Sequence, residues 1–166
     1  MEKQEEIFKT VVNDFQDKIY RLCWIYVQDD SECDDLMQEI YIKIWRNLKN
    51  FRNQSVLGTW IYKVAVNTCI DFHRGKSKQN TIHLEKIDYD RITDEEKDVE
   101  KILIESEKLQ ILQLCIQKLS EIEKTIIALY LEELKYSEIA EIIGISEKNV
   151  SVKISRIRNK MKSFLP

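Results

Sequence analysis

The stretch that decides the fold runs Tyr136-Ser-Glu-Ile-Ala-Glu-Ile-Ile-Gly-Ile-Ser-Glu-Lys-Asn-Val150 and continues as a basic segment to Lys162. It predicts a short helix, a tight turn that contains Gly144, and a longer second helix. Ser137 and Ser146 are expected to cap these helices, because a serine oxygen accepts hydrogen bonds from the unpaired amides of a first turn. Gly144 stands where the chain leaves the first helix, a position that favours left-handed dihedral angles. This layout is typical of a helix-turn-helix.

The second of these helices is predicted to have an apolar side and a basic side. Its apolar residues recur at helical spacing, so they are expected to be buried: Val150, Ile154, Ile157, Met161 and Leu165. Between Lys148 and Lys162 there are six basic residues and no acidic one. A solvated helix on a small bundle is the alternative. The capped turn in front of the basic helix favours DNA recognition, because a recognition helix needs such a support.

Composition favours an all-helical protein. The 166 residues include three glycines and one proline, and apolar residues recur at helical spacing almost everywhere. No apolar run is long enough to span a membrane, and the acidic N-terminus is unlike a signal peptide, so a cytoplasmic protein without membrane insertion is expected. The cysteines form no Cys-x-x-Cys pair, which predicts buried or idle thiols and neither a metal site nor a cofactor: Cys23, Cys33, Cys69 and Cys115.

Charge is divided strongly along the chain, although the net charge is only −3. Residues 1–39 carry a net charge of −7, whereas residues 40–80 carry +7. The segment 81–108 is acidic, with 5 basic and 10 acidic side chains, and it precedes the basic C-terminal helix. Two separate basic zones in an acidic protein indicate two contacts with polyanions.

This pattern predicts two small helical domains, at residues 5–75 and 108–166, joined by an acidic linker at residues 76–107. The second domain is expected to open with an apolar helix near Leu109–Lys118. A capping box at Ser120–Glu123 then predicts a helix that runs to about Leu131.

A helix predicted over residues 34–48 has two apolar regions. One arc is an ordinary core stripe: Leu36, Met37, Ile40, Tyr41, Ile44 and Leu48. The opposite arc mixes carboxylates and amides with two large apolar side chains: Asp35, Gln38, Glu39, Ile42, Trp45 and Arg46. An apolar spot in polar surroundings suggests a docking face for another protein. The alternative is that Trp45 packs on a neighbouring helix.

The next predicted helix, over residues 56–75, has a face with different chemistry. Its inward arc is Leu57, Ile61, Val64, Ala65, Thr68 and Phe72. Another arc carries Trp60, Lys63, Asn67 and Arg74, and a polar turn at residues 52–55 precedes it. These groups suit single-stranded nucleic acid, because rings stack on unpaired bases, amides read base edges and cations follow phosphates. A purely structural role is the alternative.

Together these residues resemble conserved regions 2 and 4 of bacterial sigma-70 factors, in the small extracytoplasmic-function (ECF) group. The region 2 motifs are Asp35-Leu-Met-Gln-Glu-Ile-Tyr-Ile-Lys-Ile-Trp45, Phe51-Arg52, Ser55, Thr59-Trp-Ile-Tyr-Lys-Val-Ala65, Asn67, Asp71 and Arg74. The region 4 motifs lie at residues 131–146 and 150–158. The chain departs from the family pattern at Leu119-Ser120, commonly Leu-Pro, at Lys63, commonly Arg, and at Arg156-Ile-Arg158, commonly Arg-Ala-Arg. These departures concern the promoter sequence rather than the fold.

The resemblance implies a dissociable subunit that directs RNA polymerase core to promoters and helps to melt the −10 region. Binding to the clamp helices of the largest polymerase subunit would use Asp35, Gln38, Glu39, Ile42 and Trp45. Contacts with the −10 element would use Asn53, Gln54, Ser55, Trp60, Lys63, Asn67 and Arg74. Region 4 would dock on the polymerase flap and read the −35 element with Lys148, Asn149, Ser151, Val152, Lys153, Ser155 and Arg156. An anti-sigma protein is a further expected partner.

Two other classes of function compete with this reading. A stand-alone helix-turn-helix regulator that binds duplex DNA explains residues 108–165 equally well but leaves both N-terminal faces unused. An enzyme is disfavoured, because Asp29, Asp30, Asp34 and Asp35 do not match the Asp-Asp-x-x-Asp magnesium motif. The two histidines, His73 and His83, belong to no Glu-x-x-His pair and no evident catalytic triad.

Overall fold

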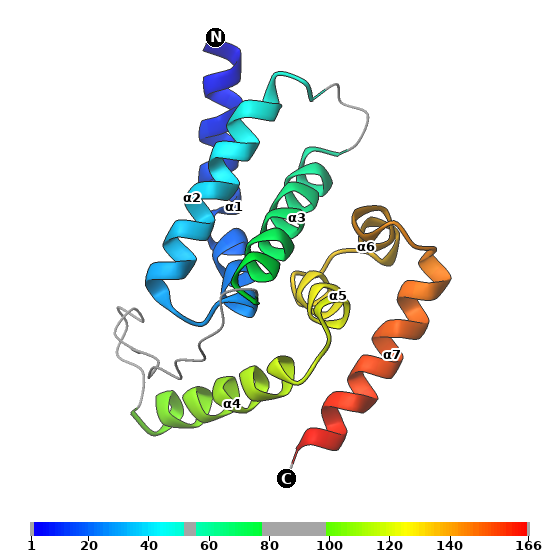
Figure 1. The fold of residues 1–166 in the computed structure, drawn as a ribbon. Coiled ribbons are helices and arrows are strands. Elements are labelled where there is room, and N and C mark those ends of the chain that lie inside the picture. Colours follow the sequence, from blue (N-terminus) through cyan, green and yellow to red (C-terminus); the bar gives the residue numbers. More distant parts are fainter. Residues whose placement is uncertain (1, 52–55, 78–98, 166) are drawn as a thin grey trace.

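The computed structural model describes residues 2–51, 56–77 and 99–165, and every regular element in these ranges is a helix (Figure 1). In chain order the helices are α1 (Glu2–Tyr26), α2 (Asp30–Leu48), α3 (Leu57–Ser77), α4 (Val99–Gln117), α5 (Glu121–Leu131), α6 (Tyr136–Ile143) and α7 (Glu147–Phe164). The predicted all-helical class is confirmed. None of the described helices combines the length and the apolar character that a membrane span requires.

Most helix ends follow the capping chemistry of the sequence. The Ser146 hydroxyl accepts a hydrogen bond from the backbone N–H of Asn149 at 3.2 Å, and Gly144 ends α6 with a φ of +81°. At the start of α5, the Glu123 carboxylate accepts from the backbone N–H of Ser120 at 2.8 Å, which completes the predicted capping box. These contacts satisfy amides that the helices themselves leave unpaired.

The predicted cap at Ser137 was wrong. Helix α6 begins at Tyr136, so Lys135 is its N-cap residue and Ser137 already lies in the first turn. The backbone N–H of Lys135 donates to the Glu138 carboxylate at 2.7 Å. A carboxylate three residues into the helix therefore reaches back to the cap position, and the serine hydroxyl is not needed there.

Helices α1, α2 and α3 lie alongside one another and form an N-terminal group (Figure 1). The predicted stripe of α2 faces its neighbours, with Leu36, Ile40, Ile44 and Leu48 buried. Met37 and Tyr41 pack beside this stripe and are half-buried. Full burial of an aliphatic side chain of this size stabilises a fold by about 1.5–3 kcal/mol, so the stripe is a large part of what holds the group together.

Helices α4 to α7 form a C-terminal group in which α5 is central and α6 and α7 make the helix-turn-helix (Figure 1). Val150, Ile154 and Ile157 of α7 are buried as predicted, and Met161 is half-buried. The prediction for Leu165 was wrong, because its side chain is 51% exposed. Helix α7 ends at Phe164, and the chain turns to an extended conformation at Leu165, which removes this residue from the apolar stripe.

The two groups pack directly against each other, since α3 contacts α6 and α1 contacts α5. Their buried residues belong to one continuous apolar cluster. The division of the chain at residues 5–75 and 108–166 therefore remains a proposal. Of the segment expected to be a linker, Lys76 and Ser77 end α3 and residues 99–107 begin α4, whereas residues 78–98 lie outside the described ranges.

Candidate functional surfaces

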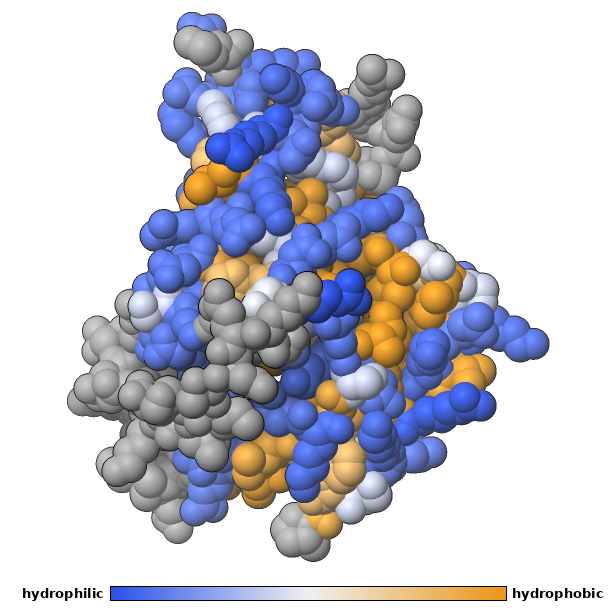
Figure 2. Space-filling model, viewed as in Figure 1, coloured by the Kyte–Doolittle hydropathy of each residue, from blue (hydrophilic) through white to orange (hydrophobic). Residues whose placement is uncertain are grey.

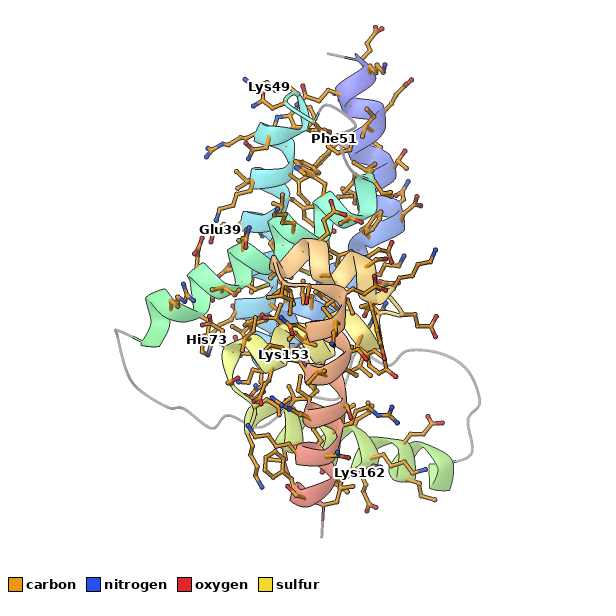
Figure 3. All side chains as sticks on the ribbon, turned by 90° about the vertical axis from the view of Figure 1, so that its right-hand side faces the viewer. Glu39, Lys49, Phe51, His73, Lys153 and Lys162 are labelled. Atoms are coloured by element: carbon orange, nitrogen blue, oxygen red, sulfur yellow. The ribbon has the colours of Figure 1, made fainter. Side chains whose placement is uncertain are left out.

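Helix α7 carries a polar face of the composition predicted for DNA recognition. Its apolar side packs against α4, α5 and α6, which fixes the direction of the opposite side. Most of the predicted DNA-reading residues are exposed there, and only Lys153 is half-buried: Lys148, Asn149, Ser151, Val152, Ser155 and Arg156. In Figure 3 this helix faces the viewer, with Lys153 near its middle and Lys162 near its end.

The cations of α7 do not all serve the same purpose. Lys160 pairs with Glu123 of α5 at 2.8 Å, so it ties α7 to the rest of the C-terminal group. This ion-paired hydrogen bond lowers the pKa of Glu123, and the backbone N–H of Ser120 acts in the same direction. Lys160 is one of the six basic residues counted between Lys148 and Lys162 in the sequence. Its carboxylate partner was missed, because the two residues are 37 positions apart.

The predicted nucleic-acid face of α3 is partly exposed and partly engaged. Lys63 and Asn67 are exposed, one helical turn apart. Arg74 donates two hydrogen bonds to Glu121 at the start of α5, at 2.8 and 3.4 Å. The structure thus brings a cation of this face against an acidic residue of the C-terminal group. The other residues predicted for this face, Asn53, Gln54 and Ser55, lie outside the described ranges.

Trp60 of α3 is half-buried, and its ring rests on a second aromatic ring. The centroid of the Phe51 ring lies 5.2 Å from that of Trp60, with an angle of 42° between the planes. Phe51 follows α2 (Figure 3), and the contact between the two rings gives Trp60 a defined orientation. Sequence reasoning did not include Phe51 in the site. The sequence feature that could have indicated its role is its position as an aromatic residue directly before the polar turn at residues 52–55.

The predicted docking face of α2 exposes Asp35, Gln38 and Ile42, and the Ile42 side chain is 49% exposed. Glu39 is half-buried and pairs with Lys43 at 3.4 Å. Figure 3 shows Glu39 projecting from the side of the N-terminal group.

Trp45 packs on α1 and lies at the border of this docking face. Its ring meets Phe8 edge-on with centroids 5.2 Å apart, and its backbone carbonyl accepts a hydrogen bond from Gln4. The alternative considered for Trp45, packing on a neighbouring helix, therefore describes a large part of its contacts. Ile42 is the exposed apolar centre of the face.

The four cysteines are buried free thiols, as expected. Cys23, Cys33 and Cys69 come from α1, α2 and α3 and lie in the core of the N-terminal group. Burial raises the pKa of Cys33 to about 12, and burial together with the neighbouring Cys23 thiol raises the pKa of Cys69. Thiols in this state are poor nucleophiles. Among the described residues no group of three or more His, Cys, Asp or Glu side chains could hold a metal ion.

Comparison with known proteins matches both halves of the chain to one family. Residues 11–79 match Sigma-70 region 2, and residues 109–161 match Sigma-70, region 4. The chain is 29% identical to the ECF RNA polymerase sigma factor SigW of Bacillus subtilis, over 97% of this chain and 90% of the relative. It is 30% identical to the ECF RNA polymerase sigma-E factor of Haemophilus influenzae, over 96% of this chain and 87% of the relative.

Solved structures show the same fold at low sequence identity. The sigma factor RpoE of Bartonella quintana, crystallised with the anti-sigma factor NepR, superposes with a TM-score of 0.75 at 17% identity, covering 96% of each chain. CnrH in complex with the cytosolic domain of CnrY gives a TM-score of 0.68 at 16% identity, covering 96% of this chain and 87% of that one.

Proposed function

This chain belongs to the sigma-70 family, in its ECF group of RNA polymerase sigma factors, and from that premise we propose how its surfaces share promoter recognition. As a sigma subunit it directs RNA polymerase core to promoter DNA. The observation that carries the assignment of surfaces is the presence of two nucleic-acid-like faces, on α3 and α7, beside an acidic and apolar face on α2. A stand-alone regulator needs only one of the three.

The polymerase-binding surface is assigned to α2. Exposed Ile42 offers an apolar contact, and it is surrounded by Asp35, Gln38 and Glu39. An apolar centre with a polar rim is the usual anatomy of a specific protein interface. The proposed partner is the clamp-helix region of the largest polymerase subunit, with Trp45 at the border of the contact. The flap is the proposed partner of the C-terminal group.

The −10 surface is assigned to the face of α3. Lys63 and Asn67 are exposed beside the oriented ring of Trp60. Stacking of an unpaired base on an aromatic ring contributes about 1–3 kcal/mol, similar to the few kcal/mol that extruding a base requires. Such a surface holds a melted strand without hydrolysis of a nucleoside triphosphate. Arg74 and residues 53–55 would complete it.

The −35 surface is assigned to α7, lying in the major groove of duplex DNA. The side-chain amide of Asn149 is of the kind that makes two hydrogen bonds to an adenine edge. Val152 is 40% exposed and offers an apolar surface for contact with a thymine methyl group. Lys148, Lys153 and Arg156 would contact guanine edges or phosphates. Each good base contact discriminates by about 1–3 kcal/mol, so a few of them specify a short element.

The cellular setting follows from the same proposal. A polymerase subunit acts in the bacterial cytoplasm, and its contribution is binding rather than catalysis, so the chain is not an enzyme. An anti-sigma factor is the proposed inhibitor. RpoE of Bartonella quintana, solved with the anti-sigma factor NepR, is a sigma factor in such a complex.

Run-off transcription with bacterial core polymerase on a promoter library tests the assignment. Specific starts are expected only with this protein. Ile42→Asp should abolish them by blocking polymerase binding, and Asn149→Ala should lower them at promoters that the wild type prefers. Lys9→Ala, a change at an exposed residue of α1 that belongs to none of the three faces, is the control and should have no effect. Tight binding to duplex DNA without any stimulation of polymerase would instead identify a stand-alone regulator.

A further inference from the structure

The first turns of α1 hold the end of α2 at two points, and both points involve Trp45. The side-chain amide of Gln4 donates a hydrogen bond to the backbone carbonyl of Trp45 at 2.9 Å. One helical turn later, the ring of Phe8 meets the Trp45 ring edge-on, with centroids 5.2 Å apart and an angle of 76° between the planes. Residues i and i+4 of a helix share a face, so Gln4 and Phe8 act on Trp45 from the same side.

The hydrogen bond from Gln4 satisfies a carbonyl at the end of α2. In a regular α-helix the carbonyl of Trp45 accepts from the N–H four residues later, which belongs to Lys49. Helix α2 ends at Leu48, and the Lys49 N–H donates to the carbonyl of Asn47 instead. The last carbonyls of a helix need partners from outside it. Gln4 supplies one, and it thereby fixes the backbone of Trp45 against α1.

Packing of rings, rather than side-chain hydrogen bonding, orients the aromatic side chains at this point. The Phe8 ring also meets the Tyr41 ring at nearly a right angle, with centroids 6.1 Å apart. The Tyr41 hydroxyl is buried, and among the described residues it has no hydrogen-bond partner. Phe8 thus contacts two aromatic rings that lie one turn apart on α2. Edge-on contacts of this kind have a preferred geometry, so Phe8 restricts the direction of the Trp45 ring.

Only part of Trp45 is left for contact with another molecule. Trp45 is half-buried, and Ile42, three residues earlier and 49% exposed, is its neighbour on the docking face. The start of α1 and the end of α2 lie side by side in the upper part of the molecule (Figure 1), whose surface is mainly hydrophilic with a few apolar patches (Figure 2). Because the apolar surface is so limited, the orientation of one large ring decides how much of it a partner can bury.

We propose that Gln4 and Phe8 are positioning residues of the polymerase-binding surface, which set the orientation of Trp45 before the polymerase binds. The inference rests on the proposed function, which assigns this surface to α2. Neither residue needs to touch the polymerase. A side chain that is already held loses less conformational freedom on binding, so loss of either contact lowers the affinity for core polymerase by about three- to tenfold. This loss acts through Trp45 and disappears when the indole is absent.

Binding of the full chain to immobilised bacterial core polymerase tests the proposal. Gln4→Met keeps the length of the side chain and removes its donor, whereas Phe8→Leu keeps an apolar side chain and removes the ring. Each should weaken binding by about three- to tenfold in the wild type and leave binding unchanged in a Trp45→Leu background. Residues with a purely structural role would weaken binding equally in both backgrounds.

Two matched variants serve as controls. Gln16→Met changes an exposed glutamine of the same helix, and Tyr41→Phe removes the hydroxyl for which the described residues offer no partner. Both should bind core polymerase like the wild type. The orientation of the ring is followed separately by fluorine resonances, with 5-fluorotryptophan at the three tryptophans of the chain. Phe8→Leu should move the resonance of Trp45 and leave the other two in place.

Unchanged binding of both Gln4→Met and Phe8→Leu, or an equal loss with and without the Trp45 indole, would overturn the proposal. Ile42→Asp keeps this test separate from the proposed function, because it acts on the exposed centre of the surface. If Ile42→Asp abolishes core binding while Gln4→Met and Phe8→Leu do not weaken it, the positioning alone is wrong. If Ile42→Asp binds like the wild type, the assignment of the surface to α2 is wrong, and the positioning with it.

Discussion

Replacement of Glu123 by Gln isolates an electrostatic contribution to the stability of the C-terminal group. In the wild type the backbone N–H of Ser120 donates a hydrogen bond to a Glu123 carboxylate oxygen at 2.8 Å. Glutamine keeps a side-chain oxygen that can accept this hydrogen bond, so the capping box is retained. The substitution removes the negative charge that faces Lys160 at 2.8 Å and the first turn of α5. The difference between the two proteins therefore reports charge rather than shape.

The expected loss in free energy of unfolding is about 1–1.5 kcal/mol near pH 7. The Lys160 side chain is 42% exposed, so solvent screening limits the ion pair to about 0.5–1 kcal/mol. A carboxylate in the first turn of a helix adds about 0.3–1 kcal/mol through the helix dipole. Urea unfolding followed by circular dichroism measures a difference of this size.

The pH dependence gives the decisive comparison. The folded state lowers the pKa of Glu123, so its stabilisation is fully present above the unfolded value of about 4.3 and is lost as the pH falls through the lower folded pKa. The two proteins should converge in stability in strong acid. A double-mutant cycle with Lys160→Met should give a coupling of about 0.5–1 kcal/mol. A difference that persists unchanged in acid, or a coupling of zero, would refute the reasoning.

Two further predictions concern the backbone and the thiols. Glu133 has a φ of +61°, so Glu133→Gly should raise the free energy of unfolding by up to about 1 kcal/mol. Gly144 has a φ of +81°, so Gly144→Ala should lower the free energy of unfolding by about 1 kcal/mol. That loss comes from the backbone, because a Cβ added at Gly144 meets no atom within 4 Å. Thermal unfolding measures the stability of both variants, and a change of the same sign in the two would contradict the argument. A thiol reagent should leave Cys33 and Cys69 unmodified in the folded protein and modify them in denaturant, as followed by mass spectrometry; rapid reaction without denaturant would contradict their burial.

Local chemistry explains why much of the fold could be predicted. The helix-turn-helix depends on a glycine with a positive φ, a serine cap and an apolar stripe, all within a few turns of each other. The α2 stripe likewise needs only helical periodicity. Where local groups compete, prediction failed. Ser137 lost its expected role because α6 begins one residue earlier, at Tyr136, and Glu138 in the same first turn accepts the hydrogen bond from the backbone N–H of Lys135.

Periodicity also predicted which side of a helix each candidate side chain occupies, but it does not determine what covers that side. Trp45 and Arg74 illustrate the difference. Trp45 meets Phe8, 37 positions earlier in the chain, and Arg74 meets Glu121, 47 positions later. Both contacts depend on how helices pack, which no local pattern specifies. The residues that make up each face could thus be predicted, whereas the residues that pack against that face in the folded chain could not.

The same reasoning explains why the interface between the two groups could not be predicted from the sequence. Its rim consists of Arg21, Glu132 and Glu121, which read as solvated charges, and the paired positions are up to 111 residues apart. Interfaces between domains that separate in use are generally more polar than permanent ones. Exposed ion pairs weaken as salt screening increases, so the polar rim contributes less to the packing of the two groups than the buried residues between them.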